Sequence, residues 1–304
     1  MTIGSALLAW AALLLAAPLT PGFATRTKSF LTGRRGPPVW QLYADLWKLV
    51  RRGVVYSNTT TWIFRAVPIV LVSTTLIATL LVPLDGRRAI LSFSGDVVAF
   101  VYLLGLARFI LVLGALDTGS SFEGMGASRE VTFASLVEPG LFVSLVALAV
   151  ASDRLSLAGM LGDPLWEGFR GTAPAIVLIA GSIFALMLAE CSRVPVDDPA
   201  THLELTMIHE VMVLDHSGPD FAMILYANAL KLSAFAAIIL DLLVRRTHVG
   251  PLGATGLLVA ALVLAGSAVG TVEAMTARLR LPKVPLYIAG GGALGFFGLI
   301  LLLQ

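Results

Sequence analysis

The chain has 304 residues, of which 57% are hydrophobic and 13% are charged, and its net charge is only +2. A soluble globular domain carries about 45 to 50% apolar and about 25% charged residues, so this composition excludes one. Disorder is excluded as well, because disordered segments are poor in apolar residues. A nucleic-acid partner does not follow from so small a net charge. The lone cysteine, Cys191, forbids an internal disulfide and cannot supply the four thiolates that an iron-sulfur cluster usually needs.

Long apolar runs recur along the whole sequence and predict a single integral membrane domain, residues 1–304. Each run has about 17 to 24 residues and can cross a hydrocarbon core of about 30 Å as a helix. The predicted fold class is all-α: a polytopic bundle of eight transmembrane helices, with amphipathic helices in its cytoplasmic loops. The expected spans lie near 3–20, 67–84, 97–116, 131–151, 173–190, 221–244, 253–275 and 284–303.

The placement of basic residues predicts the orientation of the bundle. No basic segment precedes the first apolar run, while Arg26, Lys28, Arg34 and Arg35 follow it, which indicates an uncleaved first span and not a signal peptide. Arginine and lysine concentrate in alternate loops, so the positive-inside rule places both termini outside. We expect a multi-pass protein of the inner (cytoplasmic) cell membrane. Its functional cytoplasmic loops are predicted at 21–66, 117–130 and 190–220.

The third of these loops combines three histidines and five acids between Pro195 and Gly218, an unusual density in so apolar a chain. An Asp-Pro start and a Ser-Gly-Pro end predict a helix near 199–215. His202, His209 and His216 recur every seven residues. Residues seven apart on a helix are about 10 Å apart, too far to ligate one ion, so no metal site is expected. The histidines are interpreted as hydrogen-bonding or subunit-docking groups, or as groups that exchange protons.

Several charged residues fall within or beside the predicted spans. An acid or base near the centre of a span costs about 2.5 to 3.5 kcal/mol, so it should pair, face water or be neutral. Glu138 lies beside Pro139 in the fourth span, and Arg108 in the third span is a candidate partner for it. The alternatives are a buried ion pair that fixes helix packing and a relay for protons or cations. The candidate relay residues are Arg108, Asp117, Glu123, Glu130, Glu138, Glu190 and Lys231.

The first cytoplasmic loop contains GRRGPPVWQLYADLWKLVRR from Gly33, which predicts a Gly-Pro turn followed by an amphipathic helix. Trp40, Tyr43 and Trp47, together with basic residues, are typical of a membrane interface. This helix either anchors the loop to lipid headgroups or forms a platform for a cytoplasmic subunit.

Two glycine pairs recur at four-residue spacing in the last two predicted spans. They are Gly266 with Gly270 and Gly291 with Gly295. This spacing lets helix backbones approach closely in lipid, so it predicts tight helix packing at both places.

Three segments occur in order between the expected spans: GRRGPPVWQLYADLWKL, ALDTGSSFEGMGASRE and AECSRVPVDDPATHLELTMIHEVMVLDHSG. On these motifs the chain resembles the subunit-1 family of respiratory complex I. The two longer motifs, and VEAMTARLRLPKVP from Val272, look most like the membrane subunit (subunit 4 type) of formate hydrogenlyase and related energy-converting nickel-iron hydrogenases. The resemblance covers nearly the whole chain.

The resemblance implies a non-catalytic, ion-coupling membrane subunit, with no catalytic residue and no cofactor of its own. Its cytoplasmic loops would bind a nickel-iron hydrogenase-like large subunit and an iron-sulfur small subunit, and an antiporter-like membrane subunit would lie beside it in the lipid bilayer. The iron-sulfur clusters and the nickel-iron centre would belong to those partners. The candidate docking residues are Asp45, Arg129, Arg193, Asp197, Glu204, His209 and Asp215.

Two departures from the quinone-reducing members weaken a quinone site. Those members resemble one another in a loop reading roughly Pro-Phe-Asp-Leu-Pro-Glu, whereas this chain has Pro-Val-Asp-Asp-Pro-Ala from Pro195. In the sixth span, Asn228 and Lys231 stand where quinone-type members carry an acid. The alternatives to the hydrogenase-type subunit are a quinone-binding subunit 1 of a complex I-type NADH dehydrogenase and a stand-alone ion transporter.

Overall fold

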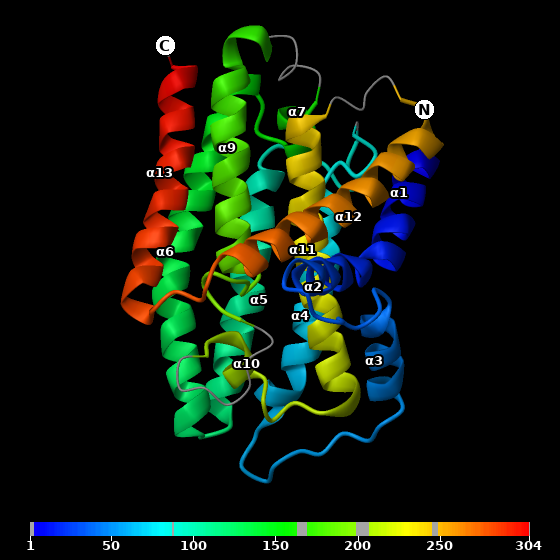
Figure 1. Cartoon of the computed structure of the whole chain (residues 1–304), viewed down its shortest axis with the longest axis vertical. Helices are drawn as coiled ribbons and strands as arrows, with labels where there is room; N and C mark the ends of the chain where they lie inside the picture. Colours follow the sequence, from blue (N-terminus) through cyan, green and yellow to red (C-terminus); the bar gives the residue numbers. More distant parts are fainter. Residues whose placement is uncertain (1–2, 87, 163–168, 199–206, 245–248, 304) are drawn as a thin grey trace.

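The computed structural model describes residues 3–86, 88–162, 169–198, 207–244 and 249–303, and within these ranges it contains helices and no strand. Long helices run between two ends of a bundle, and the first and last helices reach the same end (Figure 1). The predicted all-α fold is confirmed. We call the opposite end, which carries α3 (Gln41–Val50) and α10 (His209–Met212), the loop end.

Seven of the described helices are long and apolar enough to cross a membrane, and a bent pair at the start of the chain can supply an eighth span. The chain is therefore a multi-pass membrane protein, as expected. Two short elements, α7 (Leu157–Met160) and η1 (Leu281–Lys283), lie in connections. The seven long helices are α4 (Trp62–Leu81), α5 (Asp96–Asp117), α6 (Ser121–Ser152), α9 (Phe169–Glu190), α11 (Gly218–Leu243), α12 (Pro251–Met275) and α13 (Val284–Leu302).

The first span is bent, whereas the sequence predicts one continuous helix over 3–20. The structure has α1 (Ile3–Ala16) and α2 (Leu19–Leu31), with 46° between them. Pro18 lies at the break because its nitrogen cannot donate the helical hydrogen bond to the carbonyl of Leu14. That carbonyl accepts instead from the hydroxyl of Tyr226, at 3.0 Å. A carbonyl left bare in lipid would be costly, so this contact stabilises the bend.

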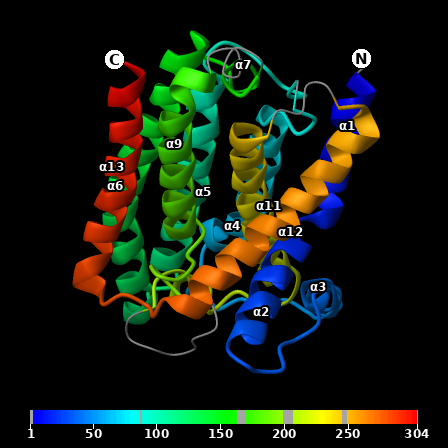
Figure 2. The ribbon, with the colours of Figure 1, turned by 45° about the horizontal axis from the view of Figure 1, so that its top comes forward.

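Close glycine contacts fix the oblique helix α12 against α2, and the two pack along each other (Figure 2). A Cβ atom on Gly270 would lie 2.2 Å from the carbonyl oxygen of Ala24, and one on Gly266 would lie 2.4 Å from that of Thr20. In α13, a Cβ atom on Gly295 would lie 2.4 Å from a serine hydroxyl of α6. The tight packing predicted from the glycine pairs is confirmed.

The segment predicted as the cytoplasmic loop 117–130 is helical for most of its length, because α6 begins at Ser121. A helix of 32 residues is about 48 Å long, so its polar first turns extend beyond an apolar core of about 30 Å. Those turns pack on the loop that precedes α11. Arg129 donates to the carbonyl of Met207 at 2.9 Å, and Gly126 lies against Ile208.

The predicted helix 199–215 is wrong in its described part. Residues 199–206 lie outside the described ranges, and among the following residues only His209–Met212 is helical. The carboxylate of Asp197 accepts hydrogen bonds from the backbone nitrogens of Ile208 and His209, which starts the single turn there. The amphipathic helix expected after Gly33 is present as α3, with Trp40 and Trp47 exposed beside it and on it.

The contact between α2 and α12 gives a prediction about stability. Gly270→Ala should lower the free energy of unfolding by about 1 to 3 kcal/mol, because the new Cβ must push α12 away from a backbone carbonyl. Thermal unfolding of the chain in detergent measures the change. Gly256→Ala on the same helix is the control, since nothing lies within 4 Å of a Cβ there, and it should not lower stability. Equal unfolding temperatures for the two variants would contradict the prediction.

Candidate functional site

Arg108, in the middle of α5, lies at the centre of a group of acidic side chains. Its Nε donates to Glu130 Oε1 at 3.1 Å, and its two terminal nitrogens donate to Glu138 and to Glu190. Arg108 is therefore paired with carboxylates from two other helices, α6 and α9. The pairing of Arg108 with Glu138, expected from the sequence, is present in the structure.

Lys231 on α11 joins the same group through Glu190. Its Nζ lies 3.6 Å from Glu190 Oε1 and donates to the backbone carbonyl of Glu190 at 2.6 Å. Only 9% of the Arg108 side chain and 1% of the Glu190 side chain are exposed. We call Arg108, Glu130, Glu138, Glu190 and Lys231 the charged cluster. With every member ionised, the charged cluster has two positive and three negative charges.

Local helix geometry explains how the sequence brings these groups together. Glu130 and Glu138 are eight residues apart on α6, which places them on one helix face about two turns apart. Glu190 is the last residue of α9, where the final carbonyls have no partner within the helix. That end carries a partial negative charge and favours a cation such as Lys231. The cluster thus ties α5, α6, α9 and α11 to one another.

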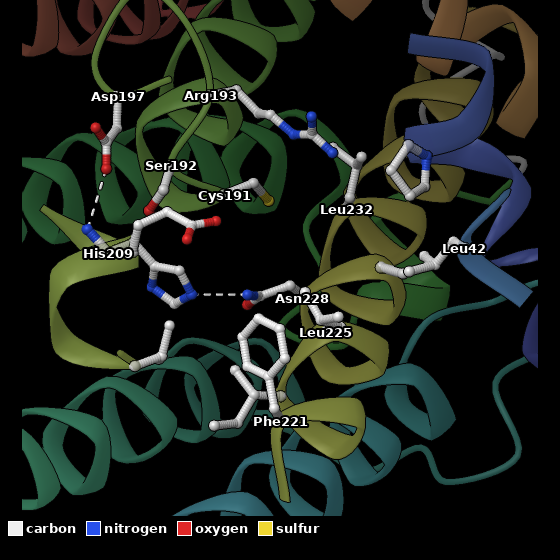
Figure 3. A pocket seen from close by; sticks show the side chains of 15 residues that line it. Leu42, Cys191, Ser192, Arg193, Asp197, His209, Phe221, Leu225, Asn228 and Leu232 are labelled. Atoms are coloured by element: carbon white, nitrogen blue, oxygen red, sulfur yellow. Dashed lines mark hydrogen bonds between the residues drawn. The ribbon is translucent and has the colours of Figure 1, made fainter. Parts of the chain in front are cut away.

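A cavity of about 120 Å³ lies at the loop end, between α11, α10 and the segment after α9 (Figure 3). Cys191, Arg193 and Asp197 line it, together with His209 and Asn228. His209 and Asn228 also line a second cavity, of about 20 Å³, whose other walls include Arg108, Glu130 and Lys231. The smaller cavity has room for about one water molecule.

The side chains of His209 and Asn228 form the boundary between the two cavities. Nε2 of His209 and Nδ2 of Asn228 are 2.7 Å apart and share a hydrogen bond (Figure 3). Burial, and then the positive charge of Lys231, lower the pKa of His209 to about 3. The imidazole is therefore neutral near pH 7. His209, which the sequence predicts as a docking residue, lies between the larger cavity and the smaller cavity beside the charged cluster.

Three other predicted docking residues are bound within the chain. Asp197 accepts backbone hydrogen bonds and lies 2.8 Å from Nη2 of Arg278, and its burial raises its pKa. Arg193 lies 3.4 Å from Glu273 on α12, and Arg129 holds the loop before α11. These contacts fix the loop to α6, α12 and the α12–α13 connection.

Two residues of this network, Glu273 and Arg278, are not among the site residues predicted from the sequence. Glu273 also lies 3.6 Å from Lys28 on α2, so it joins two cations. A signal for them was available, because both lie in the segment VEAMTARLRLPKVP that carries part of the family resemblance. An acid near the end of an apolar span would have justified a search for its basic partners.

The remaining predicted residues lie away from the charged cluster. Asp117 accepts from the backbone nitrogen of Thr61 at 2.7 Å and so caps α4. Glu123 is buried at the start of α6, near Asp215, which is exposed. Asp45 is half-buried on α3 and accepts from Gln41, and Glu204 lies outside the described residues. In the part of the chain that the structure describes, no three His, Cys, Asp or Glu side chains gather in a way that could hold a metal ion.

Comparison with known proteins identifies the family. The sequence model of the family described as NADH dehydrogenase matches residues 3–289. The chain belongs to this family. Hydrogenase-4 component C of Escherichia coli (strain K12) is 33% identical over 230 residues, which cover 76% of this chain and 71% of that protein. Formate hydrogenlyase subunit 4 of the same strain is 28% identical over 293 residues, 94% of each chain.

Two further comparisons are more remote. An NADH-quinone oxidoreductase subunit of Anaplasma phagocytophilum (strain HZ) is 25% identical over 243 residues, 70% of this chain and 68% of that protein. A chain of the membrane-bound sulfane sulfur reductase, an archaeal respiratory membrane complex, superposes with a TM-score of 0.81 over 98% of both chains. At 18% identity this likeness shows the shared fold alone. The resemblance inferred from the sequence motifs is confirmed.

A second buried histidine lies at the loop end, apart from both cavities. The ring of His216 stacks on Phe64 of α4 with centroids 3.9 Å apart and planes 4° from parallel. Neither of its ring nitrogens has a hydrogen-bond partner among the described residues. Burial lowers the pKa of His216 from 6.5 to about 4. The folded loop end therefore favours the neutral form of this ring.

This environment predicts that the loop end weakens in acid. Because the folded pKa of His216 is below the unfolded one, its contribution to stability is present above about pH 6.5 and is lost as the pH falls towards 4. Amide hydrogen exchange of residues 207–217 between pH 7 and 5 measures the loss. His216→Phe keeps the aromatic stack and removes the titration, so exchange in this variant should depend less on pH. An unchanged pH dependence would contradict the assignment to His216.

Proposed function

We propose that this chain is the membrane-anchoring, ion-coupling subunit of a hydrogenase-type oxidoreductase complex in the inner cell membrane. The observation that carries the proposal is the charged cluster, which joins four spanning helices and has an unequal number of positive and negative groups. The names of two relatives, a hydrogenase component and a formate hydrogenlyase subunit, support redox partners of that kind. The iron-sulfur clusters and the nickel-iron centre would belong to those partners, and an antiporter-like membrane subunit would lie beside the chain.

The geometry supports a relay that enters from the loop end. In this proposal a proton passes from the larger cavity past His209 and Asn228 into the smaller cavity, and from there to the carboxylates around Arg108. A neutral imidazole can accept a proton at one ring nitrogen and release one from the other. The smaller cavity, of about 20 Å³, is too small for a hydrated sodium ion, so the proposed ion is a proton.

The relay residues in this proposal are the five members of the charged cluster. Glu123, which is buried at the loop-end start of α6, would lie near the entrance. The contacts of Asp117 favour a capping role, since its carboxylate holds the first turn of α4. The relay is proposed without a step at Asp117.

Docking of the redox arm is proposed on the exposed part of the loop end. Trp40 and Trp47 expose most of their side chains there, and the guanidinium of Arg51 lies 4.1 Å above the Trp47 ring. Asp215 is exposed at the same end, whereas Arg129, Arg193 and Asp197 are bound within the chain. Exposed aromatic and arginine side chains are the types that dominate protein interfaces.

The other two functions considered from the sequence have less support. Ligand pockets usually enclose about 300 to 1,000 Å³, and the cavity beside His209 encloses about 120 Å³, so this cavity gives quinone binding at the loop end no support. A stand-alone transporter is not favoured, since the named relatives are components or subunits of larger assemblies.

The relay is tested by Glu138→Gln in the complex purified through this chain and placed in liposomes. The amide keeps the size and one acceptor oxygen of Glu138 but cannot titrate, so the variant should keep its redox arm and turn over while ion movement per turnover falls by about tenfold or more. If Glu138 only fixes packing, the loss of a charge beside Arg108 should reduce assembly instead.

The control for this experiment is Asp241→Asn. Asp241 is a buried acid on α11 ten residues after Lys231, about 15 Å further along the helix, so its replacement should leave the relay unchanged. An assembled Glu138→Gln complex that moves ions as well as the Asp241→Asn complex would exclude the relay.

The docking surface is tested by reversing the charge of one exposed acid. Asp215→Lys at the loop end should reduce the amount of redox partners that copurify with the chain, without changing its unfolding temperature. Asp153→Lys, an exposed acid at the other end of the bundle, should not. Asp197→Lys should lower the unfolding temperature itself, because it places a cation against Arg278. Full copurification with Asp215→Lys would exclude Asp215 from the docking surface.

A further inference from the structure

Glu138 is the one member of the charged cluster whose side chain is exposed to a large extent, at 41%. It lies 14 residues before Ser152, the last residue of α6, and is therefore about 21 Å from that end of the helix. This position is well within the hydrocarbon core that α6 crosses. A carboxylate that faced lipid tails at that depth would be costly, since the tails offer it neither water nor a hydrogen-bond donor.

The surroundings of Glu138 form an exposed face where α5 and α6 pack together, which we call the α5–α6 seam. The seam combines large apolar side chains of α5 with the hydroxyl of Ser135 on α6, one helical turn before Glu138. Small hydroxyl side chains are typical of helix contacts in membranes, where close packing and hydrogen bonds drive association. The seam consists of Tyr102, Leu106 and Phe109 of α5 and Ser135 and Glu138 of α6.

The net charge of the charged cluster indicates that a positive group is missing at the seam. Its three carboxylates outnumber Arg108 and Lys231 by one. Oε1 of Glu138 is held by Arg108, and no described residue donates a hydrogen bond to its Oε2. One further positive group beside Glu138 would balance the cluster and satisfy that oxygen.

We propose that a transmembrane helix of another membrane subunit covers the α5–α6 seam and places a lysine or arginine side chain against Glu138. Lipid tails have no hydrogen-bond donor to offer at this depth. A second copy of this chain would bring the same patch to itself in a two-fold dimer, and two Glu138 carboxylates would then face each other. The proposal depends on the membrane embedding of the bundle and not on ion coupling.

The proposal is tested by photo-cross-linking in native membranes. p-Benzoylphenylalanine is placed at Phe109 of α5 or at Ser135 of α6, the membranes are irradiated, and the adducts are mapped by mass spectrometry. Phe296 on α13 is the matched control, since it is also a phenylalanine within a spanning helix and is 53% exposed, compared with 59% for Phe109. It shows how the reagent behaves on an exposed face outside the seam.

Both seam positions should link to one transmembrane segment of a different protein, and that segment should carry a lysine or arginine within one turn of the linked residue. Replacing that basic residue by methionine should lower the yield of the Ser135 adduct by about tenfold or more, because it leaves Oε2 of Glu138 without a donor in the interface. Adducts to lipid alone, to a second copy of this chain or to a segment without a basic residue would overturn the proposal. Absence of any protein adduct at both positions would overturn it as well.

Discussion

The positive charge of the Arg108 guanidinium must be balanced inside the bundle, and the rest of the structure depends on this constraint. A cation in the middle of a spanning helix must be matched by anions, because removing it from water costs several kcal/mol. Here the anions come from α6 and from the end of α9, and Lys231 of α11 is matched in turn by Glu190. The helices cannot slide past one another without exposing one of these charges to lipid. Electrostatic pairing therefore sets the register that apolar contacts alone would leave loose.

The loop end follows the same logic around a single acid, Asp197. Its buried carboxylate binds two backbone nitrogens of the segment before α11 and the guanidinium of Arg278. Because a buried carboxylate needs several donors, it draws distant parts of the chain to one point. The wall of the larger cavity is built by this convergence, and with it the position of His209.

The sequence predicts the features that depend on local composition, and it misses those that depend on distant contacts. Apolar runs located the spans, and the cost of buried charge indicated a carboxylate partner for Arg108. The bend at Pro18 was missed because the residues on both sides remain apolar. The start of α6 was missed because a helix that extends beyond the membrane has the polar composition of a loop. The helix expected over 199–215 fails in its described part because Asp197 captures its backbone nitrogens, a contact that no local pattern encodes.

Glu190 joins the chemistry of the cluster to the mechanics of the backbone. Lys231 holds both the carboxylate and the final carbonyl of this residue, and the chain passes directly from it into Cys191 and the wall of the larger cavity. A displacement of the lysine ammonium therefore pulls on the last turn of α9 and on the covalently attached segment together. The position of the buried charges and the position of the cavity wall are thus linked through a single residue, Glu190.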